Sequence, residues 1–161
     1  MHLADILPSS FFRWCENMPL GHYVRGATWV FAIVETVHIM ALAVLLGIMV
    51  VIDLRLMGLG MKRQPATELS EILSPWFWTA FVTMVVTGIS LFSSEAVRLS
   101  TSEPFAFKMV FLFLAIAVHL TIHRKVIANG VEGGMLGKVA ACVSLFCWFG
   151  IALAGRAIAF F

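Results

Sequence analysis

The sequence predicts an all-α integral membrane protein, a four-helix bundle preceded by a short N-terminal helix in the membrane interface. Of the 161 residues, 61% are hydrophobic and 12% are charged. A soluble globular domain is about 45–50% apolar and about 25% charged. Four apolar stretches each approach the roughly 20 residues that cross the hydrocarbon of a bilayer. Their length and lack of strict polar–apolar alternation exclude the strands of a membrane β-barrel.

The expected spans lie within a single domain, residues 1–161, and cover residues 27–52, 76–92, 105–126 and 139–161. In the second connection, Ser102 is expected to cap the third span, with Pro104 in its first turn. Residues 9–18 place aromatic side chains beside Arg13 and Glu16. This mixture is typical of an amphipathic helix that lies in the interface.

Basic residues set the expected orientation. The first and third connections carry six Lys and Arg, whereas the N-terminal segment and the second connection carry three: Arg13, Arg25 and Arg98. Lys and Arg concentrate on the cytoplasmic side of membrane proteins. We therefore expect a multi-pass protein of the bacterial inner membrane with both termini in the periplasm. Counting Lys108 and Arg156, which lie within spans, narrows the margin to six against five.

Ionisable residues inside the spans are the candidate functional residues, because such groups are costly in a membrane. Glu35 and His38 lie three residues apart in the first span and share a face. The third span carries one polar face, and Arg156 lies near the end of the fourth. The residues on that third-span face are Lys108, His119 and His123. A hydroxyl stripe in the second span is expected to face the interior: Thr79, Thr83, Thr87, Ser90 and Ser94.

Depth suggests which histidines meet. Spans one and three run in the same direction, and a helix rises about 1.5 Å per residue. His38 then lies about 16 Å, and His119 about 21 Å, from the start of its span. We therefore expect His38 to face a third-span histidine, with His119 nearer in depth than His123.

Two imidazoles facing each other between helices suit the iron of a b-type haem. Lys108 and Arg156 lie toward one membrane face, where they would bind the propionates. Hydroxyls of the second span would accept hydrogen bonds from the ligand rings. The pattern predicts a haem protein that serves as an electron-transfer or anchoring subunit. Its partners would be lipid, a quinone or other redox partner, and further copies or subunits of a membrane complex.

Two alternatives remain open. Glu35 with the three histidines also offers donors for copper, zinc or non-haem iron. Alternatively, the histidines only join helices by hydrogen bonds in a cofactor-free scaffold subunit. Glu35 is also expected to pair with Lys108 or Arg156, because an isolated buried charge is costly. Nothing in the sequence indicates catalysis beyond electron transfer, and its short basic runs give no support to nucleic-acid binding.

Several motifs, given with their sequence letters, carry a resemblance to a known family. They are residues 35–38 (ETVH), Gly47, 53–58 (DLRLMG), 104–108 (PFAFK), 123–124 (HR), Trp148 and 155–159 (GRAIA). The chain resembles a family of small bacterial inner-membrane proteins catalogued as a domain of unknown function. The resemblance implies that His38 and His123 are the family's histidines, and it implies no activity. More loosely, the architecture is similar to membrane cytochromes b and copper-resistance membrane proteins.

Overall fold

The structure, a computed structural model, describes residues 8–60, 63–123, 125, 127 and 134–158, with only the backbone of residues 122 and 123. Its described part contains four helices long and apolar enough to cross a membrane. They are α3 (Thr28–Leu56), α4 (Ala66–Ser94), α6 (Glu103–Val118) and α8 (Met135–Ala157). The expected all-α, four-helix membrane architecture is confirmed, and the chain is a multi-pass membrane protein.

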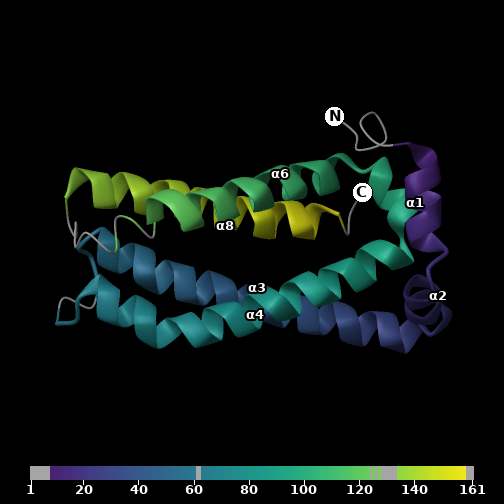
Figure 1. Ribbon diagram of the computed structural model, residues 1–161, viewed down its shortest axis with the longest axis horizontal. Coiled ribbons are helices and arrows are strands. Elements are labelled where there is room, and N and C mark those ends of the chain that lie inside the picture. The colour runs from purple at the N-terminus through teal and green to yellow at the C-terminus, as the bar shows by residue number, and fades with distance from the viewer. Residues whose placement is uncertain (1–7, 61–62, 124, 126, 128–133, 159–161) are drawn as a thin grey trace.

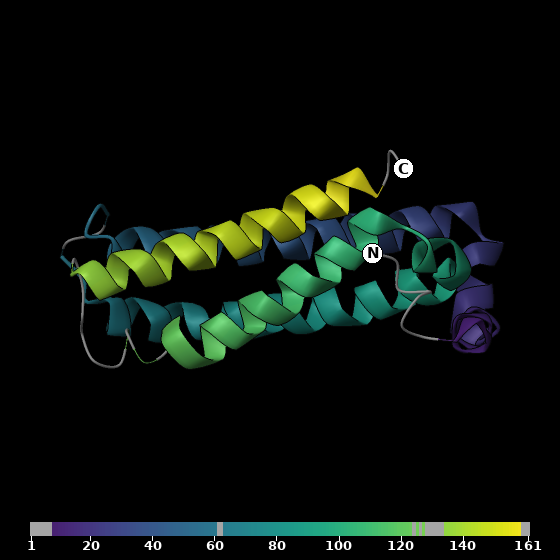
Figure 2. The same cartoon turned by 90° about the horizontal axis from the view of Figure 1, so that it is seen from above.

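The long helices form two layers (Figure 1). Helices α3 and α4 pack together in one layer, and α6 and α8 pack together in the other. Figure 2 shows α8 lying over α3 and α6 lying over α4. The core follows from the contact of α8 with α3. Leu45 and Met49 of α3 are fully enclosed there, as are Trp148 and Ile151 of α8.

Three short helices cover one end of the bundle, which we call the capped end. They are α1 (Ser9–Glu16), α2 (Pro19–Gly26) and α5 (Ala96–Ser100). Helix α1 confirms the short amphipathic helix expected over residues 9–18, and it packs on α5. Helix α2 lies against α4 so closely that a Cβ on Gly21 would meet the Ser93 carbonyl oxygen at 2.3 Å. Glycine is therefore required at that contact.

Each long helix overlaps one of the expected apolar spans, and α4 extends farthest beyond its span. Ser102 caps α6 by accepting a hydrogen bond from the Phe105 backbone N–H at 3.4 Å, as expected. Helix α4, however, begins at Ala66, ten residues before the expected start at residue 76. Pro65 stands at its N-cap, where proline is tolerated, and Pro75 lies within the helix. The helix therefore extends beyond the expected apolar span, because the first stretch of α4 is polar yet helical.

Candidate functional site

The histidines that the sequence placed face to face line two different cavities. His38 of α3 lines a cavity of about 550 Å³ at the capped end of the bundle. His119 lines a smaller cavity of about 280 Å³, together with residues at the start of α4 and the end of α3. That second cavity lies at the opposite end. The structure therefore does not bring His38 and His119 together.

Register explains the difference. The expected depths were counted from the start of each apolar stretch, as though both spans entered the membrane level with each other. In the structure His38 lies beside Lys108, the sixth residue of α6. His119 follows Lys108 by eleven residues, which is about 16 Å along a helix. Helix α3 begins farther from the bundle centre than α6 does. His38 therefore lies at the same depth as Lys108.

The large cavity is lined by the four long helices and α5. Its wall is mostly apolar, with Leu42 and Leu46 from α3, Leu91 from α4 and Phe105 from α6. Six ionisable side chains also line it: Glu35, His38, Glu95, Arg98, Lys108 and Arg156. An apolar wall with a few converging polar groups is the usual form of a small-molecule site.

A chain of hydrogen bonds fixes the His38 ring. The Thr87 hydroxyl donates to the Thr83 backbone carbonyl at 2.6 Å. It can therefore accept from His38, whose Nδ1 lies 2.9 Å away. On the other side, Lys108 Nζ lies 3.3 Å from Nε2 and has only donors to offer. This network assigns the proton to Nδ1 and leaves the lone pair of Nε2 toward Lys108.

Glycines make room for these two side chains. A Cβ on Gly88 of α4 would lie 3.3 Å from Cε1 of His38, which is tighter than an ordinary contact. A Cβ on Gly155 of α8 would lie 3.7 Å from Lys108 Nζ. His38 is 8% exposed, so its ring orientation is determined by α4 as well as by its own helix. The expected hydroxyl stripe of α4 contributes Thr87 to this contact.

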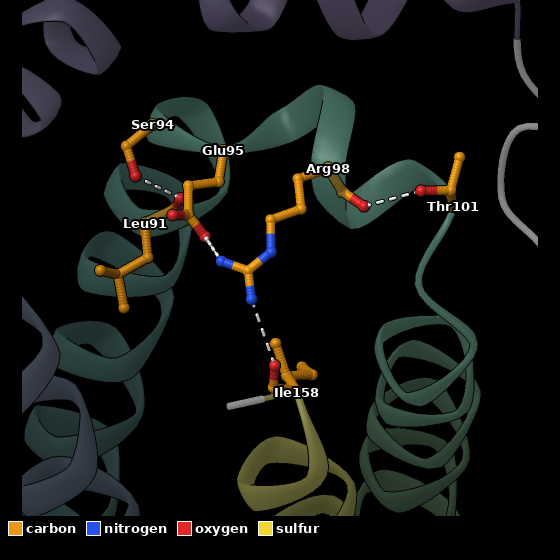
Figure 3. Close-up of polar contacts among 6 residues, drawn as sticks. All are labelled: Leu91, Ser94, Glu95, Arg98, Thr101 and Ile158. Carbon is orange, nitrogen blue, oxygen red and sulfur yellow. Dashed lines mark hydrogen bonds and ion pairs between the residues drawn. The ribbon is translucent and has the colours of Figure 1, made fainter. Parts of the chain in front are cut away.

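Arg98 and Glu95 belong to the site although the sequence analysis did not select them. Arg98 donates from Nη1 to Oε2 of Glu95 at 3.0 Å and from Nη2 to the Ile158 backbone oxygen at 3.5 Å (Figure 3). These contacts join α5 to the end of α8 beside the cavity. Both residues lie in the connection between spans, so a search for charges inside the membrane passes over them. Their spacing of three residues, which suits an ion pair on one helical turn, was the available signal.

Glu35 lines the cavity with Lys108 and Arg156. The three charges do share one end of the bundle, as expected. Within the part of the chain that the structure describes, the expected ion pair of Glu35 with Lys108 or Arg156 is not formed, and Glu35 is exposed. The ion pairs at this end of the bundle that join α1, α2 and α5 residues are Glu16–Arg25 and Glu95–Arg98. Glu35 therefore borders the cavity as a charge open to its surroundings.

His119 has a packing environment. Its ring stacks on Phe77 with centroids 4.6 Å apart and planes at 21°. Phe77 in turn meets Trp148 edge to face at 6.4 Å. His119 begins a π-helical turn, η2 (His119–His123), which follows α6. His123 lies in that turn, and its side chain is outside the described residues.

The predicted metal donors whose side chains are described are divided between the two cavities. Within the described ranges, no group of three or more His, Cys, Asp and Glu side chains is placed to hold a metal ion. His38 and Glu35 line the large cavity, whereas His119 lines the smaller cavity at the opposite end. A single histidine with a neighbouring lysine is a different donor set from the one that the sequence suggested.

Comparison with known proteins now fixes the family. Residues 11–161 match the family of unknown function DUF6644. The chain belongs to the DUF6644 family. No curated protein and no solved structure matches it. The resemblance drawn from the motifs, to a family of unknown function, is confirmed over nearly the whole chain. For this DUF6644 protein, function has to be argued from the cavity itself.

Proposed function

We propose that this DUF6644 protein is a membrane b-type haem protein in which His38 supplies one axial nitrogen. The observation that carries the proposal is the fixed His38 ring, with Nδ1 on the Thr87 hydroxyl and Nε2 at the cavity beside Lys108. A metal-ligating histidine almost always donates its other ring N–H to a nearby acceptor, which fixes the tautomer and the ring orientation. His38 has this arrangement already.

The cavity suits the remainder of a haem as well as its iron. Its apolar side chains match the porphyrin faces, and its volume of about 550 Å³ lies within the range of pockets that hold ligands of this class. Lys108 and Arg156 line it on α6 and α8, where they would bind carboxylates. A bound haem supplies one-electron chemistry, and a quinone or a neighbouring redox subunit is the partner that such chemistry requires.

Among the described side chains, His38 is the histidine at the large cavity. His119 lines the other cavity and stacks on Phe77, so the proposal assigns it no ligand role. Lys108 Nζ lies 3.3 Å from His38 Nε2, so it would have to move aside for an iron to bind there. Lys108 is then free to meet a carboxylate. Of the two third-span histidines expected as the partner of His38, the proposal thus leaves out His119.

The decisive experiment is the absorption spectrum of the protein purified from haem-replete cells. We expect a Soret band in the wild type, its loss in His38→Ala, and its retention in the matched control His119→Ala. A colourless wild type would support a cofactor-free scaffold subunit. Loss of the band in His119→Ala, with retention in His38→Ala, would contradict the assignment of the site.

A bare copper, zinc or iron site has weaker support. The described side chains provide no cluster of three donors, whereas protein sites for these ions usually use three or four. Metal analysis of the same purified protein separates the two proposals. Stoichiometric copper or zinc without a Soret band would favour the metal-handling alternative.

We also propose an inner-membrane location with the capped end facing the periplasm. Support comes from the larger number of basic residues in the first and third connections. The helix ends that these two connections join lie opposite the capped end (Figure 1). A reporter that is active only in the cytoplasm, fused after Phe161, is expected to stay silent. A strong signal would reverse the orientation.

A further inference from the structure

Arg98 borders the cavity from a position outside the spans. It lies on α5, the five-residue helix between α4 and α6, and its side chain is 56% exposed. Its guanidinium contacts the Glu95 carboxylate and, more loosely, the Ile158 carbonyl (Figure 3). Arginine has five N–H donors, and these two contacts use two of them. Donors therefore remain for a ligand in the cavity.

The platform beneath Arg98 is fixed. Glu16 of α1 accepts a hydrogen bond from the Val97 backbone N–H at 3.3 Å, at the start of α5. Phe12 and Cys15 of α1 are buried against Ala96. Helix α5 is thus held from behind by α1, and its arginine side chain is the part that is able to change partner.

Resting on the proposed haem site, we propose that Arg98 recognises a carboxylate of the cavity's ligand and so sets the ligand's orientation. The 3.5 Å contact with the Ile158 oxygen is long for a hydrogen bond, so a carboxylate replaces it with a stronger, charge-assisted one. Glu95, at 3.0 Å, keeps the guanidinium in place during the exchange. The carboxylate edge of the ligand then points to α5, and its apolar body lies along α3 and α4.

Charge supports an anionic ligand. Arg98, Lys108 and Arg156 line the cavity against the two carboxylates of Glu35 and Glu95. Glu95 is already engaged by Arg98. Three cationic side chains against two carboxylates leave an excess of positive charge in the lining. This excess favours a ligand with carboxylates at one edge over a neutral ligand of the same shape.

The test compares two ligands of one shape. Apoprotein in detergent is titrated with haem b and with haem b dimethyl ester, whose carboxylates are esterified. We expect the wild type to bind haem b roughly tenfold to a hundredfold more tightly, the usual range for a charge-assisted hydrogen bond. Arg98→Gln should lower this preference by about tenfold through weaker binding of haem b alone. Arg98→Lys keeps the positive charge without the planar guanidinium, so this variant should retain part of the preference for haem b.

Arg25→Gln is the matched control. Arg25 pairs with Glu16 at the same end of the molecule and does not line the cavity, so the preference should stay at the wild-type value. An unchanged preference in Arg98→Gln, or an equal loss of both ligands, would overturn the inference and leave the haem site standing. Failure of the wild type to bind either ligand would overturn the proposed function and this inference with it.

Discussion

A histidine lies at each end of the bundle, and the surroundings of the two histidines differ. At the capped end, His38 is hydrogen-bonded by Thr87 and faces Lys108 at a large cavity with several charges. At the opposite end, His119 stacks on Phe77 and lines a smaller cavity. The comparison teaches that a histidine within a membrane span is not by itself a ligand. The groups that fix its ring, and the space in front of it, distinguish a binding site from a packing contact.

Removing Phe77 should give the largest effect on stability. Phe77 is 6% exposed and contacts both His119 and Trp148. Phe77→Ala should lower the free energy of unfolding in detergent by about 3–5 kcal/mol, the usual cost of truncating a buried aromatic. The Soret band, measured at a temperature where the variant is folded, should be unchanged. A lost band in the folded variant would show that the two ends are not independent.

Replacing Lys108 should raise the free energy of unfolding, whereas replacing Phe77 lowers it. Lys108 is half-buried, and its hydrogen bond within the described structure is to His38. Lys108→Met removes an amine from the membrane interior, where lysine is costly. We expect the free energy of unfolding to rise by about 1–2 kcal/mol while haem retention falls. Loss of stability together with full haem retention would assign Lys108 a purely structural role.

A pair of glycine variants tests the space around the His38 ring. Gly88→Ala places a methyl group 3.3 Å from the ring, so we expect weaker haem retention because the ring has to shift. Gly47→Ala on α3 meets open space and should raise helix stability by at most about 1 kcal/mol. The measurement is the rate of haem transfer to an acceptor protein. Equal rates in the two variants would contradict a tightly fitted ring.

Glu35→Ala should have the smallest effect. Glu35 is exposed, and its expected ion pair is not formed within the described residues. Removing a carboxylate that is outside any described ion pair is expected to lower the free energy of unfolding by at most about 0–1 kcal/mol. Thermal unfolding in detergent should therefore shift little. A loss of several kcal/mol would show that Glu35 does pair with a cation in the membrane.

Much of the fold could be predicted because its signals are local. Hydropathy and length identify four spans, and Ser102 with Pro104 marks the start of α6. Amphipathicity identifies α1. The start of α4 was missed because residues 66–75 are polar enough to resemble a loop. Helix α2 was missed because Pro19, Gly21 and Gly26 within its eight residues are typical of turns.

The sequence by itself determined which side chains are available inside the membrane: one histidine on α3, a lysine and further histidines on the third span, and hydroxyls on α4. Only the tertiary structure decided which of them meet. Helical periodicity gives the face on which a residue lies, and it gives no axial offset between two helices. That axial offset depends on how the helices pack and on where α5, in the connection between α4 and α6, lets α6 begin. Here it places His38 beside Lys108 and leaves His119 to stack on Phe77.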